Sequence, residues 1–476
     1  MLRTPEQIPL GPTLTEAQAR DIVAQGEEAA VFALLQLAKM LAEQQAAQAA
    51  VSHDSPGTPS GMKPPYTKAP CSSRGRKKPG RKTGHSGSRR PIPDRIDRRV
   101  SHRADACPDC GGPLNRCRET RTRYTEDIPE VTPMVTEHTI HRDWCPQCRK
   151  KVEPNVTDAL PGSTLGTRLL SLTAWLHYGL GNTLSQIIEV FNFHLQMKIS
   201  SGGLLQMWRR LAEILYPWYE QIRREALDSA VLHADESSWR VNGKTHWLWC
   251  FANESSSLFL IDRSRGSPAL EKFFTQEFGG TLVSDFWGAY NWVACEQRQT
   301  CLVHLLRDLE HTEKYKSPRT DWPQFAKKMR RLVRDAIRLW KRRDELTPET
   351  FASRRGRLDA RLEELIDTAW DDSQARRLIK RLRRHANDLF TFLDQPGVPF
   401  DNNLAERAIR PAVIIRKNSY GNRSDQGADV QAILMSIFLT LKKRGLNPIE
   451  TVRNSMTEYL KSGQLPPLPQ HTTPIG

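Results

Sequence analysis

The sequence has no apolar run long enough to cross a bilayer, and its first residues lack the charged-then-apolar pattern of a secretory signal peptide. Acidic residues are also in short supply, since 54 Asp and Glu stand against 70 Lys and Arg and leave a formal net charge of +16 over 476 residues. We therefore expect a cytoplasmic protein with no membrane partner. The positive excess predicts a polyanionic partner, with nucleic acid first and an anionic membrane surface second.

Cysteine is scarce, with nine residues in the chain. A reducing compartment excludes a disulfide framework, so closely spaced cysteines are interpreted as metal ligands. Two Cys-x-x-Cys pairs occur, Cys107 with Cys110 and Cys145 with Cys148. Paired knuckles of this kind can hold a tetrahedral Zn²⁺ through four thiolates. We predict a closed, structural zinc site, and Cys117 falls outside the pattern.

Composition divides the N-terminal part of the chain into three regions. Residues 1–50 are rich in Ala, Glu, Gln and Leu and predict a helix that could serve oligomerisation. Residues 51–104 form a basic arm or linker rich in Pro, Gly and Ser, which cannot bury enough apolar surface to fold alone. Residues 105–160 hold the predicted zinc-binding domain. The basic clusters of the arm predict contacts with DNA phosphates, through Arg74, Arg76, Lys77, Lys78, Arg81 and Lys82.

Residues 161–229 follow a helical apolar period and predict an all-helical module. Within it, 183–192 and 201–215 predict two short helices joined by a turn at 194–200, which resembles a helix-turn-helix. Any helical hairpin produces the same pattern. A DNA-binding role and plain structural packing therefore both remain open for this module.

From Ala230 the apolar period changes to that of strands. The predicted elements are strands at 231–235, 246–251 and 258–261, a helix at 267–278, a strand at 281–285, a short helix through Trp287 and Tyr290, a strand at 300–303 and a helix from Leu305. Three strands, helix, strand, helix, strand is the order of a ribonuclease-H-like fold. We assign 230–317 to the first part of this domain, 318–395 to a basic helical insertion, 396–445 to the second part and 446–476 to a polar tail.

The expected fold class is thus a multidomain α+β protein. A ribonuclease-H-like α/β catalytic domain carries a helical insertion, and a zinc ribbon and a helical DNA-binding module precede it.

Two aspartates stand where a metal-dependent phosphodiester chemistry would need them. Asp235 and Asp285 each close a predicted strand. Two divalent cations held by convergent carboxylates can stabilise charge on both the attacking and the leaving oxygen. The physical pattern leaves the third carboxylate open among four residues beyond the last strand: Asp308, Glu310, Asp401 and Glu406.

Three segments carry a resemblance to a known family. The segments 233–236 (HADE), 283–290 (VSDFWGAY) and 401–427 (DNNLAERAIRPAVIIRKNSYGNRSDQG) resemble the insertion-sequence 66 family of bacterial transposases, of the DDE class. The similarity runs from about Lys63 to the tail. It implies that the triad is Asp235, Asp285 and Glu406, that a helical block is inserted before Glu406, and that a zinc-binding domain lies near the N-terminus. The run 301–307 (CLVHLLR) departs from the family pattern, so His304 is interpreted as structural.

These observations predict a DNA transposase that binds the inverted-repeat ends of an insertion sequence, cuts them and joins them to target DNA. The expected cofactors are Mg²⁺ or Mn²⁺ at the triad and Zn²⁺ at the cysteines. Basic residues around Glu406 predict a DNA clamp: Arg407, Arg410, Arg416 and Lys417. Expected partners are double-stranded DNA, further copies of the chain and accessory proteins of the same element. A catalytically inactive DNA-binding accessory protein and a structure-selective nuclease remain the alternatives.

Overall fold

The computed structural model describes residues 92–115, 119–128, 131–316 and 321–470, and only residues 20, 23, 24, 26 and 30 before them. Most of the predicted N-terminal helix and the six basic residues predicted to contact DNA in the arm therefore lie outside the described residues. Within the described ranges, no helix has both the length and the apolar character needed to cross a membrane.

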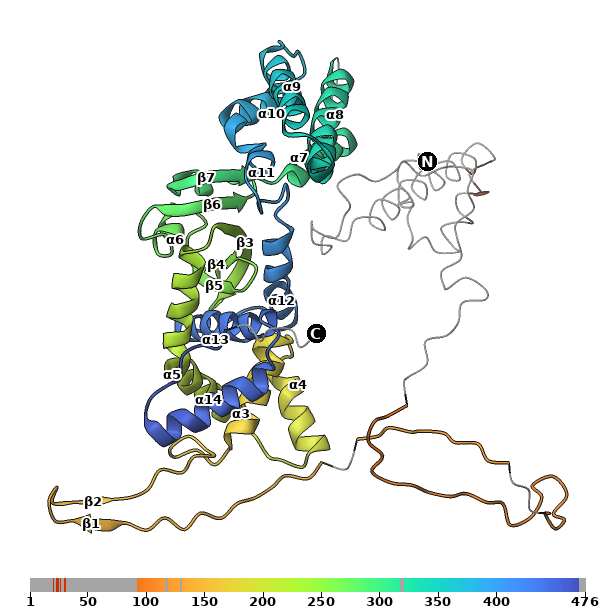
Figure 1. The fold of residues 1–476 in the computed structure, drawn as a ribbon, viewed down its shortest axis with the longest axis vertical. Helices are drawn as coiled ribbons and strands as arrows, with labels where there is room; N and C mark the ends of the chain where they lie inside the picture. The colour runs from red at the N-terminus through yellow and green to blue at the C-terminus, as the bar shows by residue number, and fades with distance from the viewer. Residues whose placement is uncertain are drawn as a thin grey trace.

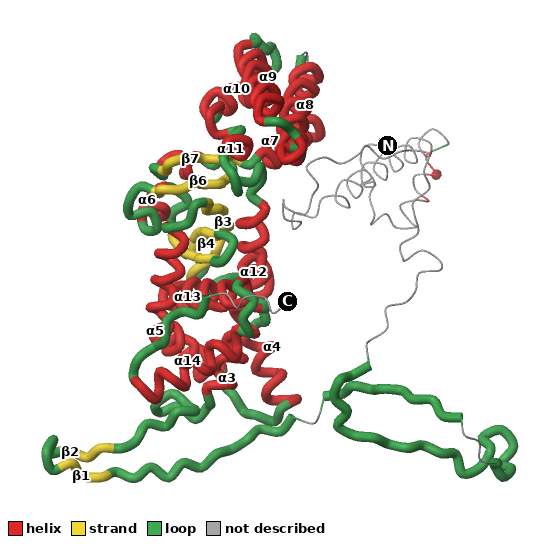
Figure 2. Tube along the Cα trace, in the orientation of Figure 1, coloured by secondary structure: helices red, strands yellow, loops and turns green. Residues whose placement is uncertain are grey.

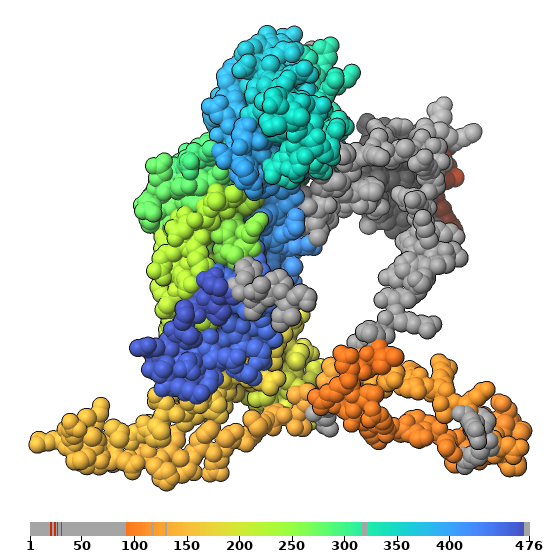
Figure 3. All heavy atoms as spheres, in the orientation of Figure 1, coloured from red at the N-terminus to blue at the C-terminus, as the bar shows by residue number. Residues whose placement is uncertain are grey.

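The segment that carries the cysteine pairs is extended and largely exposed. It contains one small hairpin, in which β1 (Asp143–Cys145) pairs antiparallel with β2 (Lys150–Val152). Figure 1 shows this segment reaching out from the base of the helical body. Figure 3 shows the insertion as a separate lobe at the opposite end of the molecule.

The predicted helical module is present. It comprises α3 (Thr167–Ala174), α4 (Leu184–Glu189) and α5 (Ser201–Leu227). Side-chain caps at Thr183 and Ser200 start the last two helices, since each hydroxyl accepts a hydrogen bond from a backbone N–H in the first turn. The second helix does not end at Leu215 as predicted, because its buried stripe continues through Trp218, Ile222 and Ala226.

A five-stranded sheet forms the centre of the fold. Its strands are β3 (Val231–Val241), β4 (Lys244–Ala252), β5 (Ser257–Asp262), β6 (Phe278–Ser284) and β7 (Cys295–Thr300), in the order β5-β4-β3-β6-β7. The first three strands are antiparallel, whereas β3, β6 and β7 are parallel. Figure 2 shows the strands between the helical insertion above and helices α13 and α14 below.

Several predicted boundaries in this region were wrong. The first strand continues to Val241, so Asp235 lies within β3 rather than at its end, because pairing with β4 extends the hairpin to the turn at Asn242 and Gly243, both with positive φ. The helix predicted at 267–278 is only α6 (Ser267–Glu271). The strand predicted at 300–303 is displaced to β7, and α7 (Leu302–Tyr315) begins where that strand was expected. Short apolar runs do not distinguish a strand from a buried helix.

The insertion is helical as predicted. It consists of α8 (Trp322–Lys341), α9 (Pro348–Asp367), α10 (Ser373–Arg384) and the short α11 (Thr391–Asp394). Its buried apolar residues form one cluster together with those of α7, separate from the main core of the sheet and body helices.

Three helices complete the chain: α12 (Asn403–Ser419), α13 (Asp425–Lys443) and α14 (Pro448–Ser462). The prediction of a polar tail from residue 446 was wrong, because α14 occupies most of it. Pro448 stands at the first turn, and the Asn447 side chain accepts hydrogen bonds from two backbone N–H groups there. Val452, Met456 and Leu460 form a buried stripe at helical spacing.

Candidate active site

The three predicted carboxylates come from three elements that meet at one end of the sheet. Asp235 lies on β3, Asp285 follows the last residue of β6, and Glu406 lies in the first turn of α12. Strands β3 and β6 are parallel neighbours with His233 paired to Val283, so the two aspartates stand two residues further along adjacent strands. Asp285 and Glu406 both lie close enough to Asp235 for their charges to act on it.

Burial and mutual repulsion make this cluster unfavourable when it is fully ionised. Burial, and then the charges of Glu236, Asp285 and Glu406, raise the pKa of Asp235 well above its usual range. Burial also raises the pKa of Asp285, although the N–H of Trp287 opposes the shift. Carboxylate oxygens are the ligands that Mg²⁺ and Mn²⁺ prefer, and a divalent cation would offset this repulsion. The donor chemistry therefore suits such a cation, although the three carboxylates are not grouped tightly enough to hold one as they stand.

Glu236 is a fourth carboxylate at the site, which the sequence analysis did not assign. Its side chain is only 3% exposed. Its Oε1 accepts hydrogen bonds from Arg265 at 3.0 and 3.2 Å, and its Oε2 accepts one from the Tyr290 hydroxyl at 2.6 Å. Burial and the charge of Asp285 raise the pKa of Glu236, while these two partners oppose the shift. Two of the quoted motifs contain Glu236 and Tyr290, whereas no sequence pattern pointed to Arg265.

Arg265 connects Glu236 to the loop that carries Asp285. Its guanidinium lies between the rings of Trp247 and Trp287, at 4.4 and 3.9 Å from their centroids. The Trp287 indole donates to the Arg265 carbonyl at 2.9 Å, and the Trp287 backbone N–H donates to Asp285 at 2.8 Å. The loop after β6 is therefore tied to β3 next to Asp235.

Asn402 joins the start of α12 to β3. Its Oδ1 accepts from the His233 ring at 3.0 Å, and its Nδ2 donates to the carbonyl of Ala234 at 2.8 Å. Its backbone N–H donates to the sulfur of Cys301 at 3.3 Å. These contacts are buried and set the position of the helix turn that carries Glu406.

Glu406 is 5% exposed and faces α7. Its Oε1 lies 3.9 Å from His304 Nε2 and 3.8 Å from Arg307 Nη1. Burial, and then the charges of Arg307 and Arg381, lower the pKa of His304 to about 4, so its ring is neutral at pH 7. The structure thus places His304 beside a candidate metal ligand, although the sequence favoured a structural role.

The other candidates for the third carboxylate lie in different surroundings. Asp308 accepts from Arg377 at 2.8 Å and from Arg381 at 2.6 Å. Burial raises the pKa of Asp308, but these two arginines more than offset it, so the net shift is downward. Glu310 is exposed, and Asp401 accepts hydrogen bonds from Asn403. Glu406 is the one of the four whose charge acts on Asp235.

The four basic residues predicted to clamp DNA have different environments. Arg407 and Lys417 are exposed, and Arg410 is half-buried. Arg416 is engaged within the protein, since its Nη1 donates to the hydroxyls of Ser237 and Ser238 at 2.9 and 2.7 Å. It therefore anchors α12 to β3.

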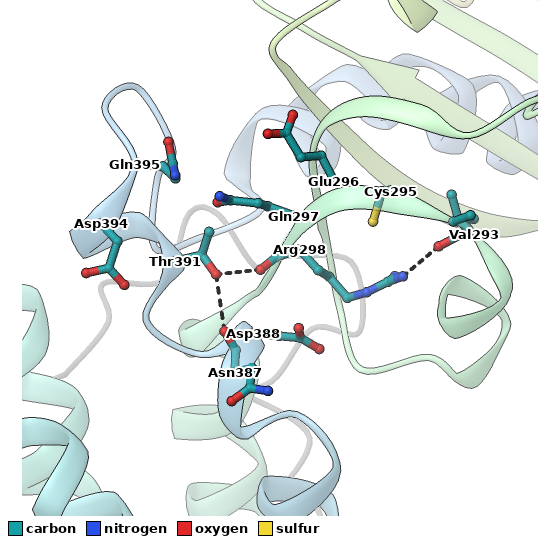
Figure 4. Close-up of a pocket in the computed structure, with 11 residues that line it drawn as sticks. Val293, Cys295, Glu296, Gln297, Arg298, Asn387, Asp388, Thr391, Asp394 and Gln395 are labelled. Atoms are coloured by element: carbon teal, nitrogen blue, oxygen red, sulfur yellow. Dashed lines mark hydrogen bonds between the residues drawn. The ribbon is translucent and has the colours of Figure 1, made fainter.

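A polar cavity of about 460 Å³ lies away from the carboxylates, where β7 meets the end of the insertion. Figure 4 shows Thr391 of α11 donating to the carbonyl of Arg298, whose guanidinium in turn donates to the carbonyl of Val293. The same guanidinium donates to the carbonyl of Tyr290 at 2.6 Å. The cavity lies next to these contacts, which hold the segment that carries Tyr290. None of the predicted site residues lines it.

Each cysteine pair forms a tight knuckle, but the structure does not bring the two pairs together. The Cys107 carbonyl accepts from Gly111 at 2.8 Å, and the Cys145 sulfur accepts from the N–H of Cys148 at 3.4 Å. Hydrogen bonds from these turns lower the pKa of the Cys107 and Cys145 thiols. Among the described residues, no three Cys, His, Asp or Glu side chains lie in a group that could hold a metal ion, and this applies to the carboxylates as well as to the cysteines. Such sites are commonly organised by the bound ion itself.

Two protein-family models match the chain. The one described as "Transposase IS66 family" matches residues 162–430, and "zinc-finger binding domain of transposase IS66" matches residues 104–149, which include all four paired cysteines. The chain is also similar to proteins of Sinorhizobium fredii. It is 25% identical to "Uncharacterized protein y4jD" over 425 residues, which cover 79% of this chain and 78% of that protein. It is 20% identical to "Uncharacterized protein y4hP" over 400 residues, which cover 76% and 72%.

Proposed function

The chain belongs to the IS66 family of transposases, and we propose that it binds the inverted-repeat ends of an insertion sequence and performs DNA strand cleavage and strand transfer at Asp235, Asp285 and Glu406. The observation that carries this proposal is the convergence of the three carboxylates from β3, β6 and α12. The strand order, with three antiparallel strands followed by two parallel ones, supports a ribonuclease-H-like catalytic domain.

The donor set favours two divalent cations, Mg²⁺ or Mn²⁺, which when bound stabilise charge on the attacking and leaving oxygens of a phosphodiester. Asp235 and Asp285 would hold them from a rigid sheet, and Glu406 would complete the set from α12. Glu236 positions the Asp285 loop through Arg265 and Tyr290, and Asn402 positions Glu406. The protein's own contribution is thus to hold several like charges in one place before the substrate arrives.

Arg307 is the residue best placed to receive the scissile phosphate. It lies beside Glu406, and its Nε and Nη2 atoms are buried without a hydrogen-bond partner among the described residues. A guanidinium offers paired donors that match phosphate oxygens. The neighbouring His304 ring is neutral, so Arg307 is the group that attracts the phosphate at this position.

The remaining regions supply the surfaces that would hold DNA. We assign zinc binding to Cys107, Cys110, Cys145 and Cys148, and phosphate contacts to the basic arm, Arg407, Arg410 and Lys417. The α4–α5 unit is the candidate for recognising the element ends. Because two ends must be joined in one reaction, an assembly of more than one copy is expected, with the region 1–50 as the candidate interface.

The test is a cleavage and strand-transfer assay on labelled element-end DNA with Mg²⁺ or Mn²⁺. Wild type is compared with Asp235→Ala, Asp285→Ala and Glu406→Ala, and DNA binding is measured for each. Glu310→Ala serves as the matched control, because Glu310 is exposed on α7 and outside the cluster. Metal-dependent cutting and joining, lost in the three variants and kept in the control, supports the proposal.

Other outcomes identify the alternatives. Cutting of branched DNA without joining would indicate a structure-selective nuclease. Binding without cutting, with the accessory proteins of the element supplied, would indicate an inactive DNA-binding protein. Activity that survives one substitution would remove that residue from the site.

A further inference from the structure

Five arginines line a groove of about 310 Å³ in the helical insertion, away from the carboxylate site. Arg338 and Arg342 come from α8, and Arg354, Arg357 and Arg361 come from α9. Leu339 and Leu358, both buried, also line it. Helices α8 and α9 lie side by side at the end of the molecule farthest from β1 and β2 (Figure 1).

The arginines form two rows that face each other. Residues 338 and 342 are four apart on α8, while 354, 357 and 361 are three and four apart on α9, so each set lies on one face of its helix. The link between the helices is short, which makes them antiparallel neighbours. The two rows therefore run along opposite walls of one groove.

The positive charge of this groove is only partly compensated by the residues that the structure describes. Asp335 is the only carboxylate among the lining residues, and it is shared by Arg338 at 3.2 Å and Arg361 at 2.9 Å, while Arg342 pairs with Glu345 at 2.8 Å. Arg354 and Arg357 are exposed, and no ion pair or hydrogen bond joins either of them to another described residue.

Arg355 provides a comparison on the same helix. It lies between Arg354 and Arg357 in sequence but points elsewhere, and it pairs with Asp359 and, at 2.9 Å, with Asp394. The insertion thus supplies carboxylates for Arg355, which lies outside the groove, whereas Arg354 and Arg357 inside the groove have no carboxylate partner among the described residues. Clustered like charges raise the free energy of the folded state unless an anion binds between them.

We infer that this groove binds the sugar-phosphate backbone of DNA. Every cation that lines it is arginine, whose planar fork matches phosphate oxygens with paired donors. From Arg354 to Arg361 the helix rises about 10.5 Å, at about 1.5 Å per residue. That length corresponds to about three phosphates of one strand at about 3.4 Å of axis each. The inference uses the proposed function only to choose DNA as the polyanion.

The test is a salt titration of DNA binding by the full chain, in EDTA so that no cleavage contributes. The probe is a fluorescent duplex without element-end sequence, and the variant is Arg354→Gln with Arg357→Gln. Each lost phosphate contact lowers the slope of log affinity against log salt by about 0.9. We expect the slope to fall by nearly 2 and affinity at moderate salt to weaken at least tenfold.

The matched control is Lys380→Gln with Arg384→Gln. Both residues are exposed on α10 of the same insertion, and the change in net charge is the same. Thermal melting of both variants verifies folding, and the groove variant is expected to melt no lower than wild type because repulsion is relieved. An unchanged slope in the groove variant, or an equal fall in the control, would overturn the inference.

Two further results distinguish DNA binding in the groove from binding of an acidic protein segment and from the proposed catalytic function. If the groove variant binds DNA normally but loses binding to poly-glutamate, the groove takes an acidic protein segment and the DNA assignment is wrong. Loss of cleavage in the triad variants leaves this experiment unaffected, since it contains no divalent metal. Failure of the groove and failure of the proposed catalytic function are therefore distinguishable.

Discussion

Burial and the charges of Glu236, Asp285 and Glu406 all act against the ionisation of Asp235. A raised carboxyl pKa means that the folded state holds the proton more tightly than the unfolded chain does. The stability contributed by such a group is present at low pH and is lost as pH rises through the folded-state pKa. At neutral pH the metal-free site therefore destabilises the protein.

Replacing this carboxylate should stabilise the metal-free protein. We expect Asp235→Asn to raise Tm at pH 7.5 in EDTA, by about 2–4 °C for each kcal/mol of repulsion removed. The gain should shrink as pH falls through the folded-state pKa and vanish well below about 3.9, where the wild-type carboxyl is protonated in both states. Addition of Mg²⁺ or Mn²⁺ should raise the Tm of wild type but not of the variant. Calorimetric melts across this pH range measure both effects.

Asp308 provides a control for this prediction, because its pKa is shifted in the opposite direction from that of Asp235. Its pKa is lowered because Arg377 and Arg381 outweigh burial, so its charge stabilises the folded state at neutral pH. Asp308→Asn should lower Tm at pH 7.5, and that loss should disappear in acid. If both substitutions moved Tm in the same direction, the electrostatic account of the cluster would be wrong.

Tyr290 contributes through a single hydroxyl. It is buried and donates to Glu236 at 2.6 Å. Tyr290→Phe should cost about 1.5–3 kcal/mol of stability, as for other hydrogen bonds to charged groups. It should also raise the Mg²⁺ concentration needed for half-maximal cleavage, because the loop that carries Asp285 loses a tie to β3.

The comparison for Tyr290 is Tyr219→Phe, which removes a buried hydroxyl that donates to the carbonyl of Phe259 at 2.9 Å. This change should lower stability and leave the metal requirement as in wild type. If both variants needed the same increase in Mg²⁺ concentration for half-maximal cleavage, the role of Tyr290 would be structural only.

At the scale of elements, the decisive contact is the joint between α12 and β3. Asn402→Ala would leave the buried His233 ring and the Ala234 carbonyl without their partner. At about 1–3 kcal/mol for each of the two unsatisfied groups, we expect the free energy of unfolding to fall by about 2–6 kcal/mol. Cleavage should be lost even well below the Tm of the variant, because Glu406 is displaced. Chemical denaturation and the cleavage assay measure the two effects.

Asn422→Ala tests whether that loss is specific. Asn422 makes an equivalent pair of bonds, accepting from Trp239 at 2.7 Å and donating to the carbonyl of Gly427 at 3.1 Å, but it joins a part of β3 farther from the carboxylates. A similar loss of stability with cleavage retained would assign the positioning role to Asn402. Equal loss of cleavage in both variants would refute it.

At the scale of the whole molecule, the cysteine-bearing segment is separate from the sheet and helices that carry the candidate site. Its four paired cysteines are exposed or half-buried, and it extends from the body in Figure 1. We expect Cys145→Ser to abolish zinc binding and leave the main melting transition of the core unchanged. Elemental analysis and calorimetry measure these quantities. Cys295→Ser, in β7 outside the pairs, should keep its zinc; retention of zinc by Cys145→Ser would exclude the predicted ligand set.

Periodicity predicted the helical module, the insertion and the positions of β3, β4, β5 and β6, since an amphipathic pattern reports which face of an element is buried. It failed at the ends of elements. Asp235 proved to lie inside a strand, the strand predicted at 300–303 proved to end at Thr300, and 446–476 contains α14. Pairing with a neighbouring strand or packing on another helix decides those ends, and neither is visible in a local window.

The sequence by itself predicted the class of partner, the cysteine pairs and two of the carboxylates from charge and spacing, which are properties of neighbouring residues, and the resemblance to a family chose Glu406 as the third. The tertiary structure alone decided what surrounds them. Glu236 meets Arg265 across 29 positions, and His233 meets Asn402 across 169. Strand register and helix packing create such contacts, and these depend on the whole core at once. The same holds for the arginine groove, which exists only because α8 and α9 turn their charged faces towards each other.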